Sequence, residues 1–429
     1  MTRILRSPIS IPLHWQILAA LILGGLYGFL LPHEAHYVTW AGDLFLRALR
    51  MIVAPLILCS IISGVAGLKN NLTGDSGANQ SGQSGGATLG RLGLKTLSYY
   101  AITSLLAITV GLILVNLVRP GDGMEPPAVQ EASIEVKPLN QTLLEIIPRN
   151  VFQALMQDDM LSIIFFAFLA GAVMLRMEKE KGEVLINFFQ SAFDLMMRMT
   201  DWIVRFAPLG ILGIVAGVVS EKYLEGNLLE SVKSLGAYMA VVLIALFIHA
   251  FVTLFAILRF YGGFNPLKHL KAMSSALLMA FSTSSSSATL PLTMECCEKQ
   301  AGISNRTTSF VLPLGATVNM DGTALYECVA TLFIAQAWGI ELTVTQQLIV
   351  VFTALLASVG AAGIPMAGLV TITIILSAVG LPAEAVGLII TVDRILDMFR
   401  TAVNVWSDSC GAAVIAQSEG EGIYKSDPI

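Results

Sequence analysis

Eight long apolar runs restrict what this chain can fold into more than any other feature of its sequence. They cover residues 11–31, 43–67, 98–118, 161–175, 202–220, 235–258, 309–335 and 347–379. A stretch of about 20 apolar residues is long enough for a helix to cross the hydrocarbon core of a bilayer, and most helices of a globular core are less apolar than these. We therefore predict an all-α polytopic membrane protein.

The basic residues predict how the chain is oriented in the membrane. Lys and Arg gather in residues 69–95, 176–184 and 258–271, whereas residues 32–42 contain none. Because basic loops stay in the cytoplasm, we place these three segments there, together with both termini. Acidic residues exceed basic ones in residues 119–143 and 217–234, which we expect to be loops on the outside.

A dense polar stripe lies near the end of the chain, in TVDRILDMFRTAVNVWSDSCGAAVIA, residues 391–416. Its polar side chains recur every three or four positions, at Asp393, Asp397, Arg400, Asn404 and Asp408. This spacing places them on one face of an α-helix. A soluble protein would expose such a face to water, but this chain has only 13% charged residues. Ionisable side chains inside a membrane indicate a functional site.

Two apolar segments are interrupted in a similar way. Residues 272–296 contain FSTSSSSATLP and residues 353–375 contain ASVGAAGIPMAG, so small residues and a proline, Pro291 or Pro365, break each segment. We interpret each as a re-entrant hairpin of two half-helices. A polar helix follows each hairpin, VNMDGTALYE (residues 318–327) and the stripe of residues 391–416. Such a duplication indicates inverted repeats and the binding region of a secondary transporter.

The chemistry of such a region favours ions and charged substrates. Half-helix N-termini expose N–H groups that attract anions, and half-helix C-termini expose carbonyls that attract cations such as sodium. Asp321 and Asp408 are costly to bury unless they are paired or bind a cation. Arg400 carries a planar, permanently charged guanidinium group whose N–H donors match the two oxygens of a carboxylate.

Other functional classes find no support in the residues. The five cysteines form no CxxC pair and the five histidines form no HExxH motif, so neither a disulfide framework nor a metalloenzyme is indicated. An enzyme would need a nucleophile with its base, and an ion channel an uninterrupted polar stripe; neither is visible. We expect a transporter, not an enzyme, with no nucleic-acid partner.

These motifs resemble those of the dicarboxylate/amino acid:cation symporters, which include the glutamate transporters of animals and their prokaryotic relatives. The resemblance runs from about residue 11 to 418 and is carried by SSSSATLP, NMDGTALYE, GAAGIPMAG and DRILDMFRTAVNVWSDS. It implies eight transmembrane helices plus two re-entrant hairpins, assembled as a homotrimer in membrane lipid and working as an elevator. Residues 1–258 would form mainly the scaffold, with the spans near 96–118 and 235–258 joining the transport domain of residues 259–418, before a tail of residues 419–429.

The resemblance also implies a substrate site between the two hairpin tips. The main-chain carboxylate of the substrate would be held by Ser285, Ser286, the backbone from Val359 to Gly363, and Asn404. Asp397 would bind the substrate ammonium and Arg400 its side-chain carboxylate, with polar contacts from Thr323 and Thr401.

Three sodium sites follow from the same resemblance. The first would use Asp408 with carbonyls of Gly315, Asn319 and Asn404. The second would use carbonyls of Thr317, Ser358, Val359 and Ala361. The third would use Tyr100, Thr103, Ser104, Asn319 and Asp321, and TLSYYAITS (residues 96–104) supplies the Tyr, Thr and Ser of that set.

Four further positions bear on the resemblance to this family. The arginine that archaeal members carry before the hairpin serines is Ser284 here, and the one that animal members carry in the last helix is Met398. Arg394, beside Asp393, stands one turn earlier, so it either replaces that second arginine or anchors the helix at the membrane interface. Glu327 either carries a proton, as its counterpart does in animal glutamate transporters, or simply bonds a neighbouring helix.

The motifs and the family resemblance together imply a sodium-coupled symporter of glutamate or aspartate, which we expect in a bacterial inner membrane. Protons or potassium are further candidate coupling ions. A proton-coupled symporter and a C4-dicarboxylate symporter of the same fold remain open. A neutral amino acid exchanger is disfavoured, because it would be expected to replace Arg400 with a small or polar residue.

Overall fold

The computed structural model describes residues 13–73, 85–124, 147–157, 160–360 and 367–423, and these residues form helices and no β-strand. The α-helices are α1 (Leu13–Leu30), α2 (His36–Thr73), α3 (Gly85–Val118), α5 (Val151–Met156), α6 (Met160–Met174), α7 (Lys179–Val204), α8 (Ala207–Leu224), α9 (Leu228–Ile248), α10 (Leu254–Phe260), α11 (Pro266–Thr283), α12 (Ser286–Glu295), α13 (Asn305–Val318), α14 (Asp321–Ala337), α15 (Val344–Gly360), α16 (Ala367–Ala378) and α17 (Ile390–Ser418). Short 3-10 or π segments are η1 (Pro32–Glu34), η2 (His249–Thr253), η3 (Cys296–Gln300) and η4 (Ala383–Leu388).

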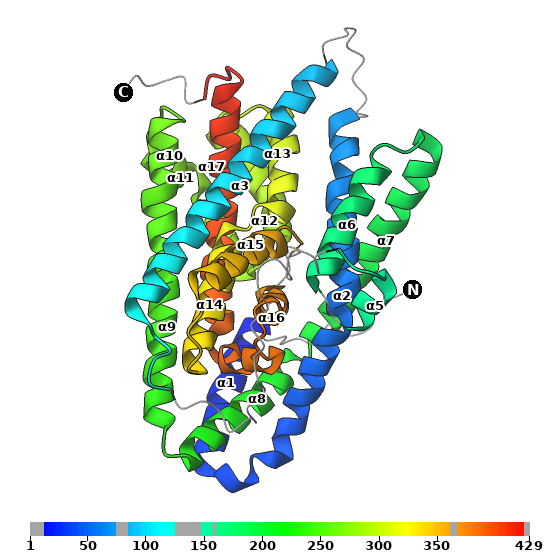
Figure 1. Cartoon of the computed structure of the whole chain (residues 1–429). Helices are drawn as coiled ribbons and strands as arrows, with labels where there is room; N and C mark the ends of the chain where they lie inside the picture. The colour runs from blue at the N-terminus through cyan, green and yellow to red at the C-terminus, as the bar shows by residue number, and fades with distance from the viewer. Residues whose placement is uncertain (1–12, 74–84, 125–146, 158–159, 361–366, 424–429) are drawn as a thin grey trace, which may run out of the picture.

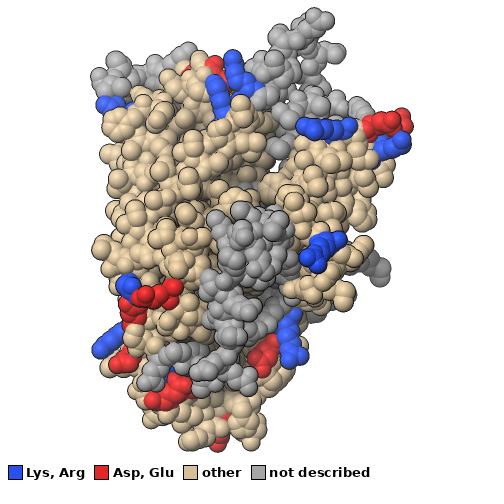
Figure 2. Space-filling view, viewed as in Figure 1, with Lys and Arg blue, Asp and Glu red and all other residues tan. Residues whose placement is uncertain are grey.

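Within the described residues, three helical stretches are long and apolar enough to cross a membrane. They are Arg91–Val118, Ala207–Leu224 and Leu228–Phe260, and shorter apolar helices occur at Trp15–Leu30, Ala54–Ser63, Phe165–Met174 and Val344–Ser358. Most of the Lys, Arg, Asp and Glu side chains visible in Figure 2 lie towards the two ends of the molecule. The flank between them is largely uncharged, as expected of a surface that faces lipid.

Two sequence-based boundaries are wrong. Residues 217–234 are not a loop, because α8 continues to Leu224 and α9 begins at Leu228. The apolar run 309–335 is not one helix, because α13 ends at Val318 and α14 begins at Asp321. Hydropathy missed this break because apolar residues flank it on both sides. In addition, α7 was absent from the apolar runs because its polar and apolar residues alternate around the helix.

The first hairpin forms two helices that meet at the serine run, as predicted. α11 ends at Thr283, and Ser284 takes a left-handed conformation with φ of 51° that stops the helix. Ser285 then caps α12, its Oγ accepting a hydrogen bond from the Ala288 N–H at 3.2 Å. The second hairpin corresponds to α15 and α16, and its tip, residues 361–366, lies outside the described residues.

The last helix runs through the interior of the bundle (Figure 1). α17 packs against α11, α13 and α14, and also against α3 and α9 from the first half of the chain. α2 packs against α6, α7 and α8, and α1 packs against α8. Because the polar stripe of α17 is buried, with Asp393 fully buried and Arg400 only 1% exposed, this stripe is not a solvated face.

Candidate functional site

The buried polar residues of α17 belong to two clusters, and the first of these also includes residues from other parts of the chain. We call the first the aspartate cluster: Tyr100, Thr103, Ser104, His249, Asn319, Asp321, Ser407 and Asp408. We call the second the charge cluster: Asp393, Arg394, Asp397 and Arg400. Asn404 lies between them along α17. The aspartate cluster combines residues from helices that are far apart in the sequence, whereas α17 alone supplies the charge cluster.

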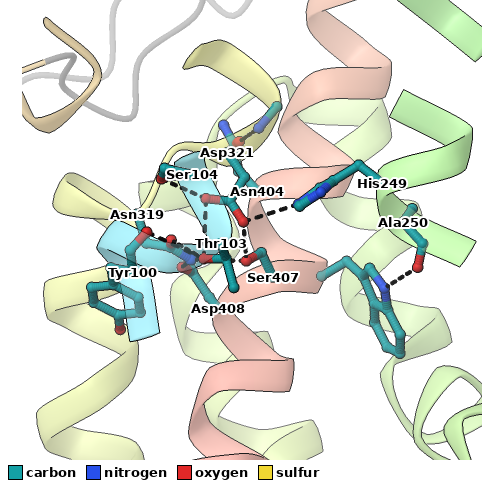
Figure 3. Close-up of polar contacts among 12 residues, drawn as sticks. Tyr100, Thr103, Ser104, His249, Ala250, Asn319, Asp321, Asn404, Ser407 and Asp408 are labelled. Carbon is teal, nitrogen blue, oxygen red and sulfur yellow. Dashed lines mark hydrogen bonds and ion pairs between the residues drawn. The ribbon is translucent and has the colours of Figure 1, made fainter. Parts of the chain in front are cut away.

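Asp321 is the centre of the aspartate cluster (Figure 3). It is the first residue of α14 and has no solvent exposure. Its Oδ1 accepts hydrogen bonds from Ser104 Oγ at 2.6 Å and Thr103 Oγ1 at 3.3 Å, both on α3. Its Oδ2 accepts one from Ser407 Oγ of α17 at 2.5 Å. The predicted third sodium set therefore includes side chains that meet around one carboxylate.

Asp408 is joined to the same cluster through Asn319. The Asn319 Nδ2 donates to Asp408 Oδ1 at 2.9 Å and to Ser407 Oγ at 3.1 Å. Asn319 can reach α17 because it stands in the break between α13 and α14. Gly315 faces the same carboxylate, since a Cβ at this position would collide with the Asp408 side chain and the Tyr100 hydroxyl.

Tyr100 and Thr103 complete this side of the cluster. The Tyr100 hydroxyl donates to the Val311 carbonyl of α13 at 2.7 Å, and Thr103 Oγ1 lies 3.4 Å from Asn319 Oδ1. The cluster thus offers carboxylate, amide and hydroxyl oxygens within a few ångströms of one another. Oxygen ligands of this kind are those that hard cations prefer.

His249 belongs to this cluster, although sequence reasoning did not select it. Its Nε2 lies 3.1 Å from Asp321 Oδ2, and both side chains are fully buried. The only sequence signal was a single histidine inside the apolar run 235–258. The search for paired histidines passed over it, because its partner is 72 residues away along the chain.

Asn404 holds the start of α14 in place. Its Oδ1 accepts a hydrogen bond from the Gly322 N–H at 2.8 Å, and its Nδ2 donates to Thr323 Oγ1 at 3.0 Å. Two predicted substrate ligands, Asn404 and Thr323, are therefore in contact. Thr401 lies one turn earlier on α17 and is 5% exposed.

The charge cluster contains two guanidinium groups and two carboxylates. Arg400 donates from Nε and Nη2 to Asp397 Oδ1 at 3.0 and 2.8 Å, and its Nη1 lies 3.1 Å from Asp393 Oδ1. Arg394 Nη1 lies 3.4 Å from Asp397 Oδ2. The two guanidinium groups balance the charge of the two carboxylates. Arg400 and Asp397, both predicted to bind substrate, are here bound to each other.

Tyr326 of α14 contacts the charge cluster from a second helix. Its hydroxyl donates to Asp393 Oδ1 at 2.7 Å, and the Arg400 guanidinium carbon lies 4.1 Å from the centre of its ring. The position over the ring is that of a cation–π contact. Arg400 is therefore fixed by two carboxylates and one aromatic face, all buried.

The next residue, Glu327, has no ion pair among the described residues. It is fully buried, and its Oε1 accepts a hydrogen bond from the Thr371 hydroxyl of α16. Its Oε2 has no hydrogen-bond partner in the described part of the chain. Glu327 is therefore hydrogen-bonded to a neighbouring helix, α16.

The remaining predicted ligands lie on the hairpins, except Thr317, which lies on α13. Ser285 caps α12, and Ser286 is 4% exposed in the first turn of that helix. Thr317 Oγ1 and Ser358 Oγ each donate to a carbonyl of their own helix, at 3.1 and 2.9 Å. Val359 lies near the end of α15, whereas Ala361 and Gly363 fall in the tip outside the described residues.

Known proteins resemble this chain over almost its whole length. A model of the sodium:dicarboxylate symporter family matches residues 13–418. Excitatory amino acid transporter 3 of Mus musculus is 34% identical over 478 aligned residues, covering 96% of this chain and 87% of that protein. The proton/sodium-glutamate symport protein of Geobacillus stearothermophilus is 35% identical over 425 aligned residues, covering 96% of each. The chain therefore belongs to the sodium:dicarboxylate symporter family and is a membrane transporter.

Proposed function

We propose that this protein is a sodium-coupled symporter of acidic amino acids, glutamate and aspartate. The observation that carries the proposal is the charge cluster, in which a buried arginine and a buried aspartate are available on one helix beside the aspartate cluster. The names of the two relatives support the same substrate, since one is an excitatory amino acid transporter and the other a glutamate symport protein.

The chemistry of the charge cluster favours an amino acid that carries a side-chain carboxylate. Such a substrate can take over both halves of the Arg400–Asp397 pair, its carboxylate replacing Asp397 at the guanidinium and its ammonium binding the released Asp397. A neutral amino acid would leave Arg400 without a new partner. A C4-dicarboxylate would bring no ammonium, so Asp397 would face a second anion. Both are therefore weaker candidates.

Arg394 then has a defined place in the substrate site. It is only 9% exposed and lies beside Asp397 Oδ2, which favours the role of a second arginine over that of an interfacial anchor. When Arg400 turns to the substrate, Arg394 remains as a cationic neighbour of Asp397. Ser285, Ser286, Val359, Gly363, Thr323, Thr401 and Asn404 complete the proposed substrate site.

We assign two sodium ions to the aspartate cluster and one to backbone carbonyls of α13 and the second hairpin. Asp408 with carbonyls of Gly315, Asn319 and Asn404 forms the first proposed site, and carbonyls of Thr317, Ser358, Val359 and Ala361 the second. Tyr100, Thr103, Ser104, Asn319 and Asp321 form the third. Each buried aspartate would then be compensated by a cation.

A proton is a second coupling ion in this proposal. Glu327 supports it, because a fully buried carboxyl group with one hydroxyl partner is costly to ionise in a membrane. The related symport protein of Geobacillus stearothermophilus is named for both sodium and protons. Potassium counter-transport has no support from the residues described.

The finer architecture is proposed from family membership. It comprises eight spans with two re-entrant hairpins as inverted repeats, a homotrimer, an elevator movement, and both termini in the cytoplasm of a bacterial inner membrane. The packing of α3 and α9 against α14 and α17 supports a transport domain that recruits these two spans, with the rest of residues 1–258 as scaffold.

Binding competition tests the substrate assignment. Purified protein should bind radiolabelled aspartate in sodium chloride but not in choline chloride of equal ionic strength. Unlabelled glutamate and aspartate should displace the label, and succinate and serine should not. Displacement by succinate at the concentration at which aspartate acts would replace amino acids with C4-dicarboxylates as the substrate.

A further inference from the structure

His249 and Ser407 are the two members of the aspartate cluster that the proposed sodium sites do not use, and both contact Asp321 Oδ2. His249 begins the π segment η2 (His249–Thr253), which interrupts the long helix formed by α9 and α10. The Leu254 N–H bonds to the His249 carbonyl, so the neighbouring Ala250 carbonyl is free to accept from Trp406 Nε1 at 3.1 Å. Single π turns of this kind are frequent at functional sites.

This local geometry turns the imidazole towards α14. His249 Nε2 lies 3.1 Å from Asp321 Oδ2, with both side chains fully buried. When Asp321 is ionised, as a sodium ligand would be, its carboxylate can only accept, and the Nε2 then carries the proton of this hydrogen bond. The other ring nitrogen, Nδ1, has no hydrogen-bond partner among the described residues, so Asp321 is the contact that orients the ring.

The two oxygens of Asp321 have different surroundings. Oδ2 is held by His249 and by Ser407, whose own oxygen accepts from Asn319. Oδ1 faces the Ser104 and Thr103 hydroxyls of α3. A hydroxyl can rotate its proton away and offer a lone pair to a cation, whereas an N–H group cannot. The carboxylate therefore has an anchored oxygen and an oxygen that is available to an ion.

We propose that His249 is a positioning residue for sodium: its N–H anchors Asp321 Oδ2 so that Oδ1 faces the hydroxyl ligands of α3. The proposal rests on the proposed function, in which Asp321 is a sodium ligand. His249 itself does not touch the ion. Groups that orient metal ligands in this way commonly change metal affinity by about 10- to 100-fold when they are removed.

Three substitutions test this role in the full-length protein. His249→Phe keeps an aromatic ring but removes the donor. His249→Gln keeps an amide N–H at a reach close to that of Nε2, whereas His249→Asn carries its amide at the shorter reach of Nδ1. Trp406→Phe is the matched control, because it removes the hydrogen bond to Ala250 in the same segment without touching Asp321.

The readouts are the sodium concentration that gives half-maximal aspartate binding and the aspartate affinity at saturating sodium. We expect His249→Phe and His249→Asn to raise the sodium requirement by about tenfold or more, with little change in aspartate affinity at saturating sodium. His249→Gln should recover most of the parental value, and Trp406→Phe should match the parent. If His249→Phe does not fold, the comparison of Gln with Asn makes the same test.

Several results would overturn the proposal. An unchanged sodium requirement in the Phe and Asn variants would remove His249 from the site, and an equal shift in Trp406→Phe would reduce its role to packing. Asp321→Asn serves as the reference. If that variant keeps the parental sodium dependence, Asp321 is not a sodium ligand, and the failure then lies in the proposed sodium site itself. A protein that binds aspartate equally well without sodium would refute sodium coupling as a whole.

Discussion

Arg400 donates from Nε and from Nη2 to a single carboxylate oxygen of Asp397, three residues earlier on α17. Residues three apart lie on the same face of a helix, so this pair forms without help from any other helix. A substrate that uses both residues must first separate them. Its binding therefore depends on how well its own charges replace the ion pair that it breaks.

The first prediction concerns Arg400→Thr. This variant should lose glutamate and aspartate binding and retain room for neutral amino acids such as serine. Removing one partner of a buried ion pair costs about 3–5 kcal/mol of stability. Asp393 would lose its ion-pair partner, and Asp397 would keep only Arg394. Equilibrium binding of labelled aspartate and of labelled serine measures both effects on specificity.

A double variant separates specificity from folding. Arg400→Thr combined with Asp393→Asn removes the carboxylate that has lost its ion-pair partner, so thermal stability in detergent should partly return. Aspartate binding should not return with it. Arg400→Thr protein that still binds aspartate with parental affinity would show that Arg400 does not hold the substrate.

The second prediction concerns Asp408→Asn. This substitution removes a buried carboxylate that accepts from Asn319, and with it the charge that we assign to sodium. Because ion and substrate binding are linked, the variant should need more sodium for the same aspartate occupancy. Titration of aspartate binding with sodium measures the shift. An isosteric Asp408→Asn protein with a parental sodium curve would exclude Asp408 as a ligand.

The third prediction concerns Glu327→Gln. The variant should keep sodium-driven uptake and lose the pH dependence of the parent, because an amide cannot carry a proton through the cycle. Uptake by proteoliposomes, measured from about pH 5 to about pH 8, provides the profile. Thr371→Val is the control, since it removes the hydroxyl partner of Glu327 but keeps the carboxyl group. Identical pH profiles for Glu327→Gln and the parent would leave Glu327 a structural residue.

The fourth prediction concerns the end of α17. Hydrogen bonds from Arg91 and Lys95 lower the pKa of Glu419 below its ordinary value. A lowered folded-state pKa means that this contribution to stability is present above the unfolded-state pKa, about 4.3, and is lost as pH falls through the folded-state pKa. Glu419→Gln should therefore be less stable than the parent at pH near 7, and the difference should shrink as the pH approaches about 3–4.

The expected size of this effect is modest. Arg91 is well exposed, so the ionic contribution is at most about 1 kcal/mol. Thermal unfolding in detergent at the two pH values measures it, with the exposed Glu230→Gln as the control. A stability difference that is constant with pH would show that the Glu419 contacts are not charge-dependent.

Local patterns predicted a large part of this fold. The spacing of Asp393, Asp397 and Arg400 predicted one face of a helix, and α17 has that face buried. The serine run predicted the meeting point of two helices, which Ser284 and Ser285 form. Both features are set by a few consecutive residues, so they can be found without knowing what packs against them.

Features that depend on tertiary contacts were less accessible. The break between α13 and α14 lies in an apolar run, and what stabilises it is the bonding of Asn319 and Asp321 to α3 and α17. His249 acquires its significance only from Asp321, on another helix. The Arg400–Asp397 pair is the opposite case. Its spacing was visible in the sequence, but both residues were assigned to the substrate and their mutual bond was overlooked.

Uptake of labelled aspartate into proteoliposomes tests the central claim most directly. The vesicles should contain the purified protein and choline chloride, and sodium, proton and potassium gradients should be imposed one at a time. An inward sodium gradient should drive accumulation of aspartate, unlabelled glutamate should inhibit it, and Arg400→Thr should abolish it. Accumulation that proceeds fully without sodium and follows the proton gradient alone would contradict sodium-coupled transport by this protein.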